Sequence, residues 1–269
     1  MQTLLIIANW LLPLLYLGLL IDYAWTFFLR VRQTGRTAHL PTVLAAHLAF
    51  LWLLGTYRGR GLPVNNYEVL SVLALGTALI YCIIEYATRE RRTGVFVILI
   101  AFVMQYTASV FLPHVDIYAA RDGERSLSQL HLLPAMVAYT AITISAIHGL
   151  LHLMALRDIK HQRFGVLFDR LPPVERLGTL CWHSLGLAFV FMTLAIISGA
   201  IMFSYHGAGV LPNKVVLMKI LASSAAWLIL AVAVVGRLIA HWPTARVSAI
   251  AIGGFVVVMA MLVVSIVLA

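Results

Sequence analysis

Seven of the ten histidines lie in or beside long apolar segments, and their spacing sorts them into two layers. The outer layer comprises His114, His131 and His206, and the inner layer comprises His47, His148, His152 and His183. Neutral imidazole is an axial ligand of haem iron, and two imidazoles from neighbouring helices give a six-coordinate b-type haem. The two layers therefore predict one or two b haems held by histidine pairs.

The spacing within one segment supports this interpretation. His148 and His152 are four residues apart, so a helix places both on one face, about 6 Å apart along its axis. His131 precedes His152 by 21 residues, which is about 30 Å of helix and matches the hydrocarbon thickness of a bilayer. We expect His131 to pair with His206 or His114, and His183 to pair with His152, His148 or His47.

Two other interpretations of these histidines remain open. Histidine is tolerated at membrane interfaces, and most of the seven lie within two turns of a segment end, so a purely structural role is an alternative. Metal-ion transport is a weaker alternative, because no carboxylates accompany either layer. The two cysteines form no motif for covalent haem attachment.

The elements that must position the histidines are membrane-spanning helices. The chain has 269 residues, of which 62% are hydrophobic and 11% are charged, whereas a soluble domain has roughly a quarter charged. This composition predicts an all-α polytopic membrane protein that forms a single integral membrane domain over 1–269. The eight spans expected are about 4–29, 40–57, 67–87, 94–112, 131–156, 178–204, 214–236 and 247–268.

The distribution of positive charge predicts the topology. Eight crossings place both termini on one side, and 13 of the 19 Lys and Arg residues fall in the four loops of the other side. The positive-inside rule therefore predicts external termini and cytoplasmic basic loops. The membrane that we expect is the cytoplasmic membrane of a bacterium. Nothing in the charge pattern indicates nucleic acid as a partner.

Several short motifs occur in order along the chain. They are the segment from Gly61 to Leu70, with its Gly, Pro, Asn and Tyr-Glu residues, His131 followed by Ala138 and Tyr139, the segments 171–177 and 194–199, and the set Asn213, Lys214, Trp227 and Arg237. Together these motifs resemble the cytochrome c assembly family of Ccs-type haem-handling membrane proteins and their HemX-like branch, in which the second motif is similar to the external histidine helix.

This resemblance implies a haem-binding membrane protein that acts in cytochrome c maturation, with His131 in the position of an external haem ligand. Haem-ligating synthases of the family carry a tryptophan-rich WWD segment, and here segment 205–213 has neither Trp nor Asp. A histidine expected in the next helix is replaced by Val235. We therefore do not expect this chain alone to be a covalent haem ligase or another catalyst.

Three functions are consistent with the sequence. The first is a protein that handles haem or electrons for a periplasmic c-type cytochrome or cytochrome-maturation partner, with other membrane subunits expected. The second is a dihaem b-type cytochrome subunit that transfers electrons between quinol and an external redox partner. The third is a haem-free membrane scaffold.

Overall fold

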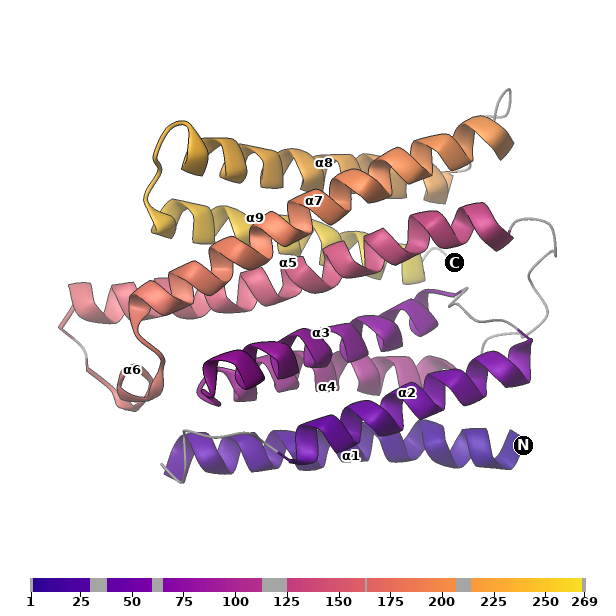
Figure 1. Cartoon of the computed structure of the whole chain (residues 1–269), viewed down its shortest axis with the longest axis horizontal. Coiled ribbons are helices and arrows are strands. Elements are labelled where there is room, and N and C mark those ends of the chain that lie inside the picture. The colour runs from indigo at the N-terminus through magenta and orange to yellow at the C-terminus, as the bar shows by residue number, and fades with distance from the viewer. Residues whose placement is uncertain are drawn as a thin grey trace. The chain divides into compact units, whose positions relative to one another are not determined.

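The computed structural model describes residues 2–29, 38–59, 65–112, 125–162, 164–206 and 214–267, which are helical with short connections (Figure 1). The helices are α1 (Gln2–Leu29), α2 (His39–Arg58), α3 (Asn66–Thr88), α4 (Gly94–Phe111), α5 (Arg125–Lys160), α6 (Val166–Arg170), α7 (Val174–His206), α8 (Lys214–Leu238) and α9 (Thr244–Val267). Within the described ranges, eight of them are long and apolar enough to cross a membrane, and α6 is not. The chain divides into two compact units, Met1–Arg121 and Asp122–Ala269.

The first unit is a ring of four helices. Helix α1 packs against α2 and α4, and α3 packs against the same two helices, so α1 and α3 face each other across the interior. Buried alanines, among them Ala74, Ala78 and Ala101, line this interior and allow close helix approach in the absence of a hydrophobic driving force.

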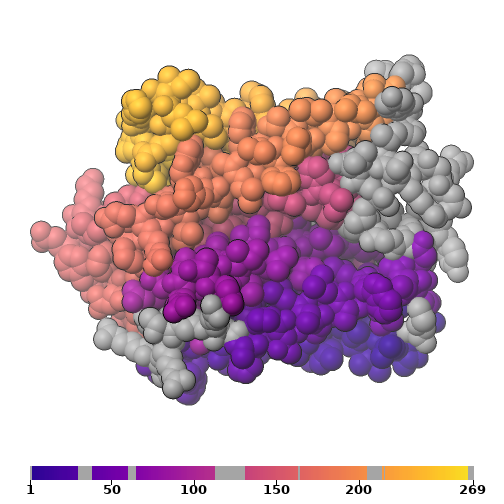
Figure 2. All heavy atoms as spheres, in the orientation of Figure 1, coloured from indigo at the N-terminus to yellow at the C-terminus, as the bar shows by residue number. Residues whose placement is uncertain are grey.

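The second unit is built around α5. Helices α7 and α9 pack directly against α5, and α8 packs against α7 and α9. In the most apolar stretch of α5, 78% of residues are buried, compared with 22% in α7 and 17% in α8. Figure 2 shows α7, in orange, covering much of α5 from one side. His148 and His152 of α5 therefore lie in the interior, whereas His131 is half-buried.

Local sequence signals explain where several helices begin and end. The side chain of Asn65 accepts a hydrogen bond from the Glu68 N–H, which caps α3, and the Glu68 carboxylate forms a buried ion pair with Arg58 at the end of α2. Pro172 and Pro173 directly precede α7, in agreement with the preference for proline at helix starts.

The predicted all-α architecture with eight spans is confirmed. The observed boundaries differ most in α5, which begins at Arg125 instead of 131, and in α7, which begins at Val174 instead of 178. The short helix α6 was not predicted. The side of the membrane on which the termini lie stays a prediction, as does the single membrane domain.

Candidate functional site

His131 lies on α5 against α7, in a fixed orientation. Its Nδ1 lies 2.8 Å from the Ala195 carbonyl oxygen of α7. A carbonyl oxygen can only accept, so Nδ1 carries a proton, and in the neutral ring the lone pair is on Nε2. Gly199 allows the ring to lie this close, because a Cβ at that position would be 3.0 Å from the ring's Nδ1 and Cε1. Half-buried His131 therefore presents a lone pair in a defined direction.

His148 lies fully buried near the other end of α5. Its Nδ1 lies 2.9 Å from the Ile144 carbonyl oxygen, one turn earlier in the same helix. Nδ1 is thus the donor, and the lone pair is on Nε2. That Nε2 is buried without a hydrogen-bond partner among the described residues. Such groups are rare in native proteins and point to a missing ligand or water.

His152 is held by residues of α9 and α7. Its Nδ1 lies 2.9 Å from the Ser248 hydroxyl, which donates to the Cys181 sulfur at 3.6 Å. A hydroxyl both donates and accepts, so the bond between Ser248 and His152 can run in either direction. The His152 Nε2 lies beside Gly178, where a Cβ would be 3.3 Å away.

Two histidines of α5 therefore share one tautomer. In the neutral rings of His131 and His148, Nδ1 donates to a backbone carbonyl and Nε2 keeps its lone pair. The same arrangement orients histidine ligands in metalloproteins, where the outer hydrogen bond fixes the tautomer and the ring. In these two imidazoles the atom that could ligate a metal is Nε2.

The number of donors suits haem iron better than a bare metal ion. No group of three or more His, Cys, Asp or Glu side chains is close enough to hold a metal ion in the part of the chain that the structure describes. A bare transition metal in a structural site takes about four protein ligands. Haem iron needs only one or two, because the macrocycle supplies the other four.

The histidines predicted to pair with those of α5 are His183, His206 and His114. His183 is exposed on α7, so its side chain does not face His148 or His152 across the α5–α7 contact. His206 is the last residue of α7, and its side chain lies outside what the structure describes. His114 also lies outside the described residues. The pairings that involve these three histidines stay predictions.

His47, in the first unit, has a different hydrogen-bonding state. Ser71 donates to the Gln105 amide oxygen at 2.8 Å, so the Ser71 oxygen accepts from Nε2–H of His47 at 3.0 Å. Nδ1 of His47 then accepts from the Tyr16 hydroxyl at 2.9 Å. Both ring nitrogens are engaged, and Gln105 continues the network to Ser109. As a haem ligand, His47 would have to break this network.

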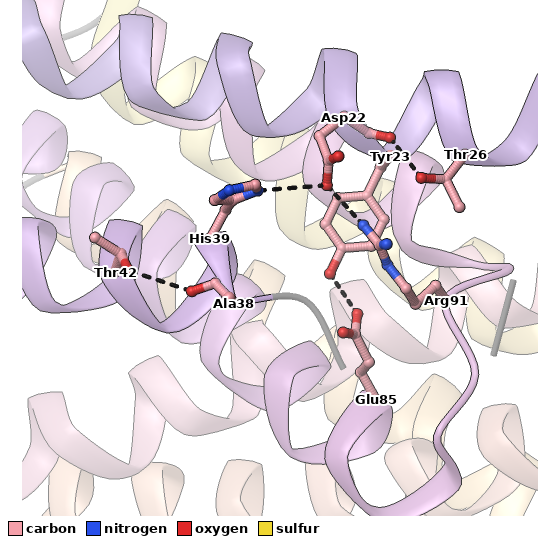
Figure 3. A network of polar contacts seen from close by, with 8 residues as sticks. All are labelled: Asp22, Tyr23, Thr26, Ala38, His39, Thr42, Glu85 and Arg91. Atoms are coloured by element: carbon pink, nitrogen blue, oxygen red, sulfur yellow. Dashed lines mark hydrogen bonds and ion pairs between the residues drawn. The ribbon is translucent and has the colours of Figure 1, made fainter. Parts of the chain in front are cut away.

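A second polar network, which the sequence did not predict, lies near the end of α1 (Figure 3). Arg91 forms an ion pair with Asp22 at 2.6 Å, and its guanidinium lies 4.9 Å from the centre of the Tyr23 ring. The Tyr23 hydroxyl donates to Glu85 of α3, and His39 lies 3.9 Å from Asp22. These contacts tie α1 to α3 and to the α3–α4 connection.

Aromatic residues line the contact between α7 and α8. The Trp227 indole N–H donates to the Thr193 hydroxyl at 2.8 Å, and its ring stacks on Phe189 with centroids 5.8 Å apart. The Tyr139 hydroxyl of α5 lies 3.4 Å from that of Ser223 in α8. The two aromatic residues noted in the sequence motifs therefore connect α5, α7 and α8.

Comparisons with known proteins agree with this architecture. The family model described as cytochrome C assembly protein matches residues 64–269. The cytochrome c biogenesis proteins CcsA from two strains of Heterosigma akashiwo are each 24% identical over 194 residues, which is 59% of this chain and 59% of the relative. No solved structure matches. Because the family model covers most of the chain, including all the histidines of α5, the protein belongs to the cytochrome c assembly protein family.

Proposed function

We propose that this chain binds b-type haem in the membrane through histidines of α5 and handles haem or electrons for a cytochrome-maturation partner. Membership of the cytochrome c assembly family supports a role in haem handling. The proposal is carried by the state of His131 and His148, whose Nδ1 atoms bond to backbone carbonyls, and by the buried His148 Nε2, which has no hydrogen-bond partner among the described residues.

The outer site is centred on His131, with His206 or His114 as the second axial ligand. The inner site uses His148 or His152, with His183 as the predicted partner from α7. Because His183 is exposed, this pair requires the side chain of His183 to turn or another histidine to replace it. We assign His47 to the structure of the first unit, since both of its nitrogens are bonded.

When bound, haem supplies a one-electron iron centre. The chain's own residues have other tasks: the carbonyls of Ala195 and Ile144 fix the tautomers of His131 and His148, and Gly199 leaves space for the His131 ring. Covalent haem ligation is not part of the proposal, because the segment between α7 and α8 lacks the WWD residues.

A second candidate function is electron transfer across the membrane by two b haems. The observation that favours it is that two histidines with Nδ1 bonded to a backbone carbonyl lie far apart on α5. His131 and His148 are 17 residues apart, which is about 26 Å along α5. Two haems at such depths suit an electron path between quinol and an external redox partner.

The remaining features of the proposal concern location and partners. The chain spans 59% of the length of the curated relatives it matches, so their activity is not transferred to it as a whole. We propose a bacterial cytoplasmic membrane, with both termini and His131 on the outer side, because basic residues concentrate in the loops of the opposite side. The partner is then a periplasmic c-type cytochrome or a maturation protein.

Haem content of purified variants tests the proposal. We would express the protein under haem-replete conditions and quantify haem by pyridine haemochrome and a reduced-minus-oxidised spectrum. We expect His131→Ala and the double variant His148→Ala/His152→Ala each to lose one b haem, whereas His161→Ala, in an exposed turn, keeps the wild-type content. A wild-type protein without haem would refute the proposal.

A further inference from the structure

Helix α5 is enclosed along its middle and has an open face at its C-terminal end. Every residue from Thr140 to Gly149 is buried, whereas Leu150 is 50% exposed and Met154 is 37% exposed. Arg157, one turn further, is also exposed. Residues at positions i, i+4 and i+7 lie on one face of a helix. Apolar surface is therefore followed by a cation along the same open face.

The order of these side chains matches the layers of one membrane leaflet. Leu150 and Arg157 are seven residues apart, which is about 10 Å along the axis of α5. Exposed apolar side chains of a spanning helix contact acyl chains, and a cation near the helix end reaches the headgroup phosphates. The open face thus has surface for both parts of a phospholipid.

The connection from α5 to α7 continues this surface with apolar side chains. Phe164 is 60% exposed and Val166 is 58% exposed, although Leu171 of the same connection is buried. The Phe164 ring meets the Phe168 ring edge-on, with centroids 5.2 Å apart. Both ends of the connection continue into helices that are long and apolar enough to cross a membrane, so it lies close to the membrane surface. Exposed apolar side chains at that level are stabilised by entering the edge of the acyl layer.

The exposed charges of this surface are positive. Arg157 and Lys160 are both exposed, and Asp158, the acidic residue between them, is half-buried. The exposed Asp169 lies on α6, three residues beyond Val166. Among the described residues from 157 to 166, the surface therefore carries two exposed cations and no exposed carboxylate. Such a surface favours anionic headgroups over zwitterionic ones.

We propose that the C-terminal end of α5 and its connection to α7 form a binding surface for anionic phospholipids. Arg157 and Lys160 contact the headgroup phosphates, Leu150 and Met154 line an acyl chain, and Phe164 enters the acyl layer beside the headgroups. The surface uses none of the histidines, so this inference does not depend on the proposed haem binding.

Lipid retention by the full-length protein tests the headgroup preference. The protein would be placed in nanodiscs of equal parts phosphatidylglycerol and phosphatidylcholine, and the lipids that it retains would be counted by native mass spectrometry. We expect wild type to retain phosphatidylglycerol preferentially. Each of Arg157→Gln and Lys160→Gln should lower this preference about fivefold, the factor that one cation contributes near an anionic membrane surface. Lys214→Gln is the matched control, because this lysine is also exposed but lies at the start of α8.

A fluorescent probe at position 164 tests whether the connection enters the acyl layer. Phe164→Cys would carry an environment-sensitive fluorophore in a Cys82→Ala background, since Cys82 is half-buried and Cys181 is buried. We expect quenching by lipids with a nitroxide near the headgroup and no quenching by aqueous iodide. Val190→Cys is the reference for a probe among acyl chains, because Val190 is 54% exposed on α7.

Three results would overturn the lipid surface. Equal retention of the two lipids by wild type, or an unchanged preference in both glutamine variants, would show that the cations do not select headgroups. Quenching of the probe at position 164 by iodide alone would show that the connection lies in water. A probe that is shielded from both quenchers in membranes of the expressing cell, but quenched by iodide in nanodiscs, would show that a protein covers the surface. Haem content is measured separately, so none of these results bears on the proposed haem binding.

Discussion

Replacement of Gly199 by alanine is expected to weaken haem binding at His131 without unfolding the protein. The new Cβ would lie 3.0 Å from both Nδ1 and Cε1 of the ring, closer than an ordinary van der Waals contact. The ring must move away from α7, and its 2.8 Å hydrogen bond to the Ala195 carbonyl lengthens or breaks. Loss of such a bond costs about 1 kcal/mol, and outer-partner substitutions lower metal affinity by about 10–100-fold.

The structure offers a matched control on the same helix. Gly186 also lies in α7, and no atom lies within 4 Å of a Cβ added there. Alanine in a helix interior is more favourable than glycine by about 0.5–1 kcal/mol, so neither substitution is expected to destabilise α7 through its backbone. Differences between the two variants then report on the His131 ring.

Titration of haem into the purified apoprotein, followed by the Soret band, measures the effect. In the double background His148→Ala/His152→Ala, only the outer site titrates. We expect Gly199→Ala to raise the haem dissociation constant about tenfold, which corresponds to about 1.4 kcal/mol, and Gly186→Ala to leave it unchanged. Equal haem affinities in the two variants would show that the close contact between Gly199 and the His131 ring does not orient the ligand.

Two further predictions concern the stability of the first unit. Arg58→Ala removes the buried ion pair with Glu68, so we expect a loss of about 3–5 kcal/mol in thermal or denaturant unfolding; an unchanged midpoint would show that this ion pair does not stabilise the contact between α2 and α3. Tyr16→Phe leaves Nδ1 of His47 without its donor, and we expect a loss of about 1–3 kcal/mol with unchanged haem content. A loss of haem in this variant would contradict the structural role of His47.

The sequence predicted the spans well, because hydrophobic length is the dominant constraint on helices in a bilayer. It placed the starts of α5 and α7 too late, since their first turns are polar and extend beyond the apolar run: Arg125 begins α5, and Val174 follows directly after two prolines. Hydropathy does not report such polar turns. It also missed α6, which has only five residues.

The candidate site was only partly accessible from the sequence. The spacing of His148 and His152 correctly placed both on α5 one turn apart, because helical periodicity is a local property. The ring partners are not local: Ser248 is 96 residues from His152, and Ala195 is 64 residues from His131. The same limit applies to His183, whose exposure on α7 depends on which face of that helix packs against α5.

The central claim is that imidazole Nε2 atoms of α5 bind haem iron, and pulsed electron paramagnetic resonance tests it directly. The oxidised wild-type protein would be prepared with ¹⁵N-labelled histidine and compared with unlabelled protein. We predict that labelling changes the nitrogen hyperfine couplings of the iron, and that His131→Ala and the double variant His148→Ala/His152→Ala each remove one set of these couplings. Haem whose couplings are the same in labelled and unlabelled protein would contradict the claim.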